Sequence, residues 1–197
     1  MKRLLSLFMA LLFCLSALSF VSSCSSKHPI DKFADRLEAN NYHFSMRMYN
    51  VPIVGDVSFK MEVDGNIRYI PAVLELDIEE CYIETVGKTT YQYTMSSYKN
   101  AEWKKTNYND ENSLIISTSD LIHTLFNPRD YEKVSGEEDT YKFKSNVVVS
   151  DFEDAVMKIK KDTCTIEGKM TIEGYTRDIK ITISKIGEIK LALPVVS

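Results

Sequence analysis

The sequence predicts an α+β fold: a curled antiparallel β-sheet (a half-barrel) with short helices packed on or lidding its concave face. Apolar and polar residues alternate with a period of two through most of the chain from Tyr42 onward, as in strands that bury one face. Turn signals such as Asp64-Gly65 and Gly87-Lys88 separate these runs. Three segments, 31–39, 118–126 and 151–160, instead show helical spacing.

Residues 1–23 are predicted to be a lipoprotein signal peptide. Lys2-Arg3 precede an apolar stretch, which ends in small residues and a cysteine. Val21-Ser22-Ser23-Cys24 resembles the lipobox of bacterial lipoproteins, which implies diacylation of the Cys24 thiol and cleavage before it. A two-chain anchor holds a protein stably at a membrane. The alternatives are an uncleaved anchor helix and an ordinary secreted protein with a chance cysteine.

On this interpretation, residues 24–30 are a lipidated tether and residues 31–197 are a single sheet-rich domain. The net charge of −4 offers no basic patch for nucleic acid or for anionic lipid, so the membrane contact is through the diacylglyceryl cysteine. We expect a monomer in the cell envelope on the extracytoplasmic side. Ser25 is not an acidic retention signal of the enterobacterial kind, which favours the periplasmic face of an outer membrane in a Gram-negative host.

The first helix is predicted over 31–39, ending at Asn40-Asn41. A meander follows, with strands expected at 42–49, 57–63, 67–70, 74–78 and 91–95.

A second helix carries Leu121, Leu125 and Phe126 and is stopped by Pro128. A strand is expected over 141–144. Residues 150–153 form a capping box, which predicts a third helix over 151–160. Strands close the chain at 166–172, 179–183 and 189–193.

This arrangement resembles the lipoprotein carriers of the Lol type and the LprG and LppX type of lipoprotein. The resemblance lies in the early helix, the Asp-Gly hairpin, the helix-breaking 126–128 segment and the closing run from Gly187 to Pro194. It implies a half-barrel whose concave apolar face, lidded by helices, holds acyl chains.

The apolar sheet face is wide, whereas the three helices offer few apolar side chains to cover it. This mismatch predicts a cavity for an apolar ligand, and the methionines favour a flexible one. The alternative is a dry, filled core. The expected ligand-binding residues are Phe44, Met46, Met48, Phe59, Met61, Leu74, Leu76, Tyr93, Leu121 and Phe126.

No catalytic constellation is evident, and we expect neither an enzyme nor a bound metal or cofactor. The three histidines, His28, His43 and His123, are far apart in the sequence and match no catalytic motif. Cys81 and Cys164 are interpreted as two buried thiols, with one disulfide between them as the alternative.

The sequence therefore predicts an envelope lipoprotein that binds a lipid or an acylated protein in a half-barrel cavity, for sequestration or transfer. The alternative is a structural or interaction lipoprotein with a filled core that binds another envelope protein.

Overall fold

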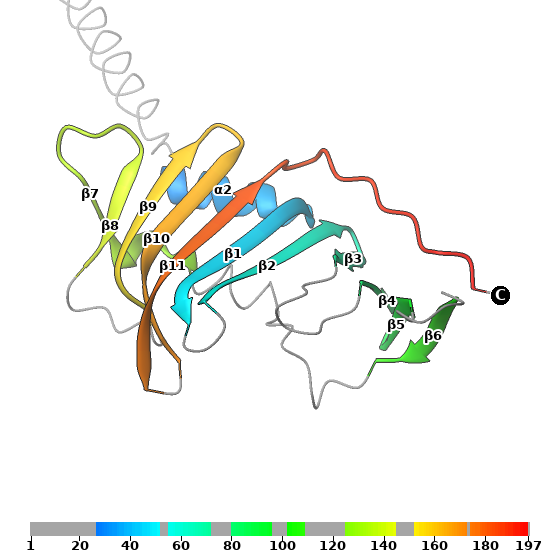
Figure 1. Cartoon of the computed structure of the whole chain (residues 1–197). Coiled ribbons are helices and arrows are strands. Elements are labelled where there is room, and N and C mark those ends of the chain that lie inside the picture. Colours follow the sequence, from blue (N-terminus) through cyan, green and yellow to red (C-terminus); the bar gives the residue numbers. More distant parts are fainter. Residues whose placement is uncertain are drawn as a thin grey trace, which may run out of the picture.

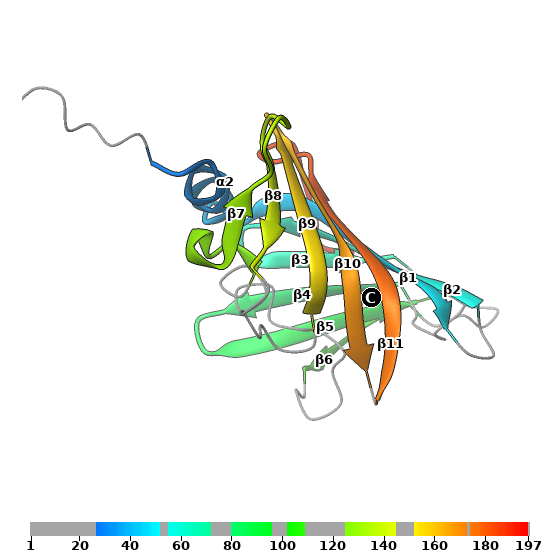
Figure 2. The same ribbon diagram turned by 90° about the vertical axis from the view of Figure 1, so that its left-hand side faces the viewer.

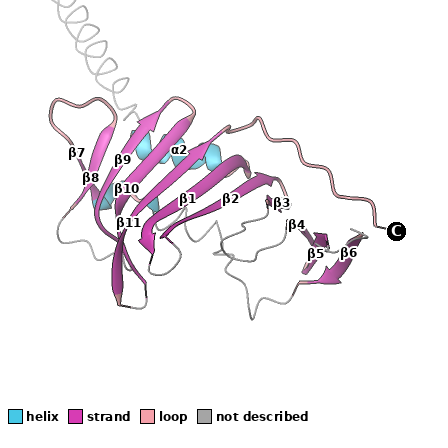
Figure 3. Cartoon of the chain, in the orientation of Figure 1, coloured by secondary structure: helices cyan, strands magenta, loops and turns pink. Residues whose placement is uncertain are grey.

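The computed structural model describes residues 27–51, 55–71, 80–95, 102–108, 125–144, 152–172 and 174–196. Their strands form one antiparallel sheet in the order β6-β5-β4-β3-β2-β1-β11-β10-β9-β8-β7 (Figures 1 and 3). The first half of the chain supplies β1 (Asn41–Val51), β2 (Gly55–Asp64), β3 (Ile67–Ile70), β4 (Cys81–Val86), β5 (Thr89–Met95) and β6 (Trp103–Asn107). The second half supplies β7 (Tyr131–Lys133), β8 (Thr140–Phe143), β9 (Phe152–Lys160), β10 (Thr163–Ile172) and β11 (Tyr175–Ser184).

The predicted α+β class is wrong. Of the described residues, 61% lie in strands and 10% in helices, so the protein is one large antiparallel sheet and not a sheet covered by several helices. The described helices are α2 (Pro29–Leu37) and a short 3-10 helix, η3 (Pro128–Asp130). Of the helix predicted over 118–126, only Leu125 and Phe126 belong to the described residues.

The helix predicted over 151–160 is strand β9, and a bulge explains the error. Asp154 has φ 52°, and the register between β9 and β10 shifts between Glu167 and Lys169. The bulge inserts one residue into the alternation of the strand. An i, i+3 spacing of apolar residues therefore arises in a strand, where it resembles the periodicity of a helix.

Helix α2 begins and ends where local chemistry favours it. The Nδ1 atom of His28 accepts a hydrogen bond from the Ile30 amide at 3.2 Å, and Pro29 occupies the first turn, where its missing N–H is not needed. Ile30, Phe33 and Leu37 lie on one face of the helix and are buried. The helix therefore starts inside the segment predicted to be a tether.

Figure 2 shows that the sheet curves and that α2 lies on its concave side. The strand register assigns side chains to faces, because directly paired residues point to the same side of a sheet. Tyr42, Phe44, Met46 and Met48 of β1 share the concave face with their partners on the two adjacent strands. Those partners are Val63, Met61, Phe59 and Val57 on β2, and Ile183, Ile181 and Ile179 on β11.

The C-terminal segment does not form the strand predicted over 189–193. It runs past the ends of β1 and β2 instead (Figure 1). Two side chains at that end of the sheet hold it there. Asn41 accepts a hydrogen bond from the Ile189 amide at 2.9 Å and donates one to the Ile189 carbonyl at 2.8 Å. Asp64 accepts one from the Leu191 amide at 3.0 Å. Side-chain hydrogen bonds thus replace a strand ladder here.

Candidate functional site

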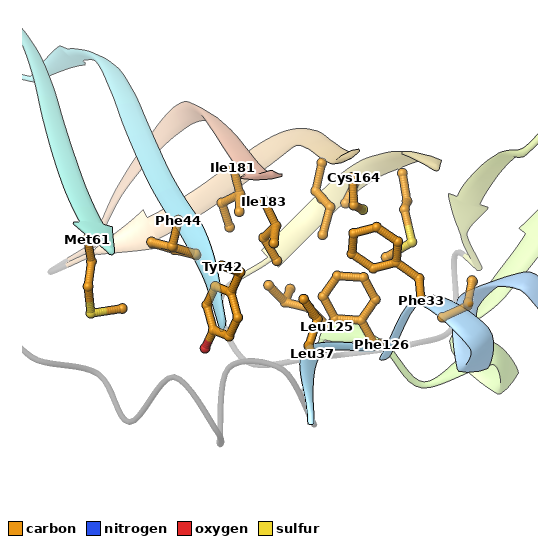
Figure 4. Packing of buried hydrophobic residues seen from close by; sticks show 14 of the residues in the cluster. Phe33, Leu37, Tyr42, Phe44, Met61, Leu125, Phe126, Cys164, Ile181 and Ile183 are labelled. Atoms are coloured by element: carbon orange, nitrogen blue, oxygen red, sulfur yellow. The ribbon is translucent and has the colours of Figure 1, made fainter. Parts of the chain in front are cut away.

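One part of the concave face is a closed core, shown in Figure 4. Phe33 of α2 stacks on Phe126 with ring centroids 5.5 Å apart, and Leu125 has no exposed surface. Helix α2 and the Leu125–Phe126 segment belong to the same buried cluster as Cys164, Ile181 and other residues of the concave face. Tyr131 on β7 fixes the second segment, because its hydroxyl donates to the Leu125 carbonyl at 2.7 Å. Burial raises the pKa of Tyr131, so the hydroxyl stays a donor.

The concave face is less covered along β1 and β2 away from α2. Tyr42 and Phe44 are buried, whereas Met46 and Met48 on the same strand and face are half-buried. The partner strand repeats this change, from buried Val63 and Met61 to half-buried Phe59 and Val57. Burial therefore decreases along β1 and β2, from the Tyr42–Val63 pair to the Met48–Val57 pair.

We call this less covered area the concave patch and define it as Met46, Met48, Val57, Phe59 and Met170. The first four are mutual neighbours, since Met46 pairs with Phe59 and Met48 with Val57. Ile181 and Ile179, their partners on β11, are 1% and 2% exposed and form the floor beside them. Met46, Phe59 and Met170 also pack against the buried core. The patch is a continuous apolar surface that borders the core.

The predicted ligand-binding residues fall into four groups. Met46, Met48 and Phe59 lie in the concave patch. Phe44, Met61 and Phe126 are at most 4% exposed and belong to the closed core. Leu74, Leu76 and Leu121 lie outside the described residues, as do Cys24 and the predicted signal peptide. Tyr93 is on the opposite face of the sheet.

The placement of Tyr93 corrects the predicted site. Tyr93 pairs with Tyr82, Tyr82 with Tyr69, and Tyr69 with Glu62. Glu62 alternates with the concave residues Met61 and Val63, so this whole row is convex. The concave positions of β5 are Thr90, Gln92 and Thr94, which makes the inner face of this strand polar.

The convex face of β3–β6 carries an aromatic cluster. Tyr93, which was predicted to lie on the concave face, belongs to this cluster. The rings of Tyr69 and Tyr82 have centroids 4.7 Å apart, and those of Tyr82 and Trp103 are 5.4 Å apart. The Tyr93 hydroxyl donates to Glu84 at 2.8 Å, and the Lys105 ammonium lies 5.0 Å from the Tyr93 ring centroid. Polar partners at their tips allow these rings to lie on an outer face.

The thiols of Cys81 and Cys164 are free and buried, as interpreted from the sequence, and they do not form the alternative disulfide. Cys81 lies on β4 and Cys164 on β10, and four strands separate them in the sheet order. Burial raises the pKa of Cys81 to about 11, against an opposing hydrogen bond from Gln92. Burial also raises the pKa of Cys164. Thiols held in the protonated form are poor nucleophiles and poor metal ligands.

The described histidines show no arrangement typical of catalysis. His43 Nδ1 lies 3.6 Å from a Glu62 carboxylate oxygen on the convex face, and burial lowers the pKa of His43 despite that carboxylate. Over the described ranges, no group of three His, Cys, Asp or Glu side chains could hold a metal ion. His123 lies outside them.

A groove of about 360 Å³ lies at the rim of the sheet, where β1, β10 and β11 end, and is lined by Tyr49, Asn50, Lys169, Thr176, Arg177 and Asp178. A neighbouring groove of about 460 Å³ includes Gly168 and the bulge residue Asp154. The register places Arg177 beside Met170, its partner on β10. Tyr49, Lys169, Thr176 and Asp178 are convex positions, so the rim groove opens toward the convex face, whereas the register assigns Arg177 to the concave face.

Among the helices in the described part of the chain, none has the length and apolar character needed to cross a membrane. Neither the comparison with protein-family models nor the comparison with curated proteins yields a match for this chain.

Proposed function

We propose that this chain is a lipid-anchored protein of the cell envelope that binds an apolar ligand, a lipid or an acylated protein, for sequestration or transfer. In this proposal the diacylated Cys24 attaches it to a membrane on the extracytoplasmic side, and the chain has no catalytic role. The observation that carries the proposal is the concave patch, which is a continuous set of half-buried apolar side chains next to a closed core.

The composition of the patch favours a flexible ligand. Three of its five side chains are methionines, whose unbranched and polarisable thioethers adapt to irregular partners. Burial of apolar surface contributes about 0.8 kcal/mol per methylene. Micromolar affinity corresponds to about 8 kcal/mol, so the ligand needs at least about ten methylenes before the cost of association is included. A long acyl chain meets this requirement, whereas a small apolar metabolite does not.

The test is native mass spectrometry of the full chain purified from bacterial membranes, followed by solvent extraction of the bound lipid. Met48→Asp places a charge in the concave patch. Ser45→Asp is the matched control, because Ser45 is on the same strand but on the convex face, opposite Lys60.

We expect the purified protein and its control to retain lipid and Met48→Asp to lose it. Fluorescence of Trp103, the sole tryptophan of the chain, verifies that both variants fold. Equal lipid content in the two folded variants would refute the concave patch as the binding surface. A protein free of lipid in all forms would refute the function.

The convex aromatic cluster favours a second candidate, an interaction lipoprotein that binds another envelope protein. Tyr and Trp side chains are enriched at protein interfaces. A photo-crosslinking residue at Asn107, which lies on the convex side of the edge strand β6 as the partner of Tyr91, should capture one defined partner in cells, and Trp103→Ala should abolish the crosslink. A crosslink that persists in Trp103→Ala would argue against this candidate.

A further inference from the structure

Charged side chains of the described strands are sorted by the face of the sheet on which they lie. The register places every strand carboxylate on the convex face: Asp56, Glu62, Asp64, Glu84, Glu132, Glu153, Asp154, Glu167 and Asp178. The charged side chains on the concave face of the same strands are all basic: Arg68, Lys104, Lys133 and Arg177. On the described strands, the charges of the concave face are thus all positive, which complements a negative ligand group.

Arg177 is the concave cation beside the concave patch. It pairs in register with Met170, and it lies two residues before Ile179 on the concave side of β11. Lys104 and Lys133 lie on the edge strands β6 and β7, and Arg68 lies on β3 between Val63 and Ile83. One end of an acyl chain that lies on the concave patch would therefore be next to Arg177.

The guanidinium of Arg177 has an N–H donor without a hydrogen-bond partner. Its Nη1 donates to the Thr176 carbonyl at 2.8 Å, and its Cζ lies 5.4 Å from the centroid of the Tyr175 ring. Its Nε is buried and has no hydrogen-bond partner, and no ion pair joins the guanidinium to a carboxylate of the described residues. An unpaired buried donor costs free energy, which a bound carboxylate would recover by accepting the N–H bonds.

We propose that the ligand is a single-chain fatty acid in its ionised form, with its carboxylate at Arg177 and its acyl chain on the concave patch. This inference rests on the proposed function and adds the head group to it. The patch spans two positions along β1 and β2, which suits one acyl chain rather than the two of a diacyl phospholipid. Arginine binds carboxylates through two parallel N–H donors, so the head group is also oriented.

The experiment uses the full chain in vesicles of net-neutral phosphatidylcholine and two photoreactive probes. One probe is a hexadecanoic acid with a diazirine in its chain, and the other is the matching hexadecanol. Labelling is measured by intact mass at equal bilayer concentrations of the probes, in alkaline buffer that ionises the acid, with excess unlabelled probe as the competitor. The labelled peptides are then mapped.

We expect the acid to be captured about ten- to a hundredfold more efficiently than the alcohol, as a charge-assisted hydrogen-bond pair implies. Arg177→Gln should bring the acid down to the level of the alcohol and leave alcohol capture unchanged. Arg68→Gln is the matched control, because it removes the same side chain from the same face away from the patch, and it should keep the preference.

The outcomes separate this inference from the function on which it rests. No competed labelling of concave-face peptides by either probe would overturn the function itself. Equal capture of acid and alcohol by the unaltered protein would leave the function standing and overturn the anionic head group. A preference that survives in Arg177→Gln, or that is lost in Arg68→Gln instead, would overturn the assignment to Arg177.

Discussion

Gly168→Ala tests how closely β9 and β10 approach each other at the bulge. A Cβ on Gly168 would lie 2.9 Å from the Cα of Ala155, 2.9 Å from the carbonyl oxygen of Glu153 and 3.0 Å from the Cβ of Ala155. Two of these three atoms are backbone, so a side-chain rotation cannot relieve the contacts and β9 itself must move. Overpacking of this kind costs about 1–3 kcal/mol. The replacement of glycine stabilises by about 0.4–1 kcal/mol through the unfolded state, so we expect a net loss of about 1–2 kcal/mol.

The assay is urea unfolding followed by Trp103 fluorescence, because Trp103 lies on β6 and the substitution does not touch it. Lys169→Ala is the control. The Lys169 ammonium of the unaltered chain is 3.7 Å from Asp154, but both side chains are largely exposed. Such ion pairs contribute about 0–1 kcal/mol to stability. Gly168→Ala/Ala155→Gly should recover little stability, since it removes only one of the three close contacts. A Gly168→Ala protein as stable as the unaltered chain would refute a tight β9–β10 approach.

Three further predictions concern the thiols, the core and the C-terminal segment. Cys81 and Cys164 should resist alkylation until the protein unfolds, and the free energy of unfolding should fall between about pH 9 and pH 11. The stability falls because the folded state keeps the Cys81 proton to about pH 11, whereas the unfolded state loses it near the ordinary pKa of 9.0. A Cys81→Ala variant whose free energy of unfolding falls equally steeply with alkaline pH would contradict this. Phe33→Ala should cost about 3–5 kcal/mol in the same urea assay, and a loss under 1 kcal/mol would mean that α2 adds little to the core. Asn41→Ala should speed hydrogen exchange at the Ile189 amide in a mass-spectrometric assay without a similar effect at β9, and unchanged exchange at Ile189 would show that other contacts hold the segment.

The hairpins and the first helix were predictable because their signals are local. Asp64-Gly65 and Gly87-Lys88 each precede a strand that pairs with the strand before it. Helix α2 follows from apolar spacing over its nine residues, a cap at His28 and a proline in its first turn. These features depend on a few neighbouring side chains, so the sequence contains all the information that they need.

The errors came from features that depend on distant chain segments. Tyr93 alternates with polar residues as an inward-facing tyrosine would, but the pairing of β5 with β4 turns it outward and leaves Gln92 inside. Strand β9 has the apolar spacing of a helix because the bulge at Asp154 is visible only in its pairing with β10. The candidate site has the same limitation: Met46 and Met48 were identified from alternation, whereas the proposed role of Arg177 depends on its register with Met170.

The order of the strands has a consequence for how the chain folds. Strands that are neighbours in the sheet are also consecutive in the sequence, except at one seam. There β1 pairs with β11, and His43 lies opposite Ser184. Two meanders can thus form from local contacts, while their union must await the closure of a loop that includes almost the whole domain. The β1–β11 seam should be the late and slow step of folding. A chain still being synthesised would hold β1 and β2 with one open edge until β11 has emerged.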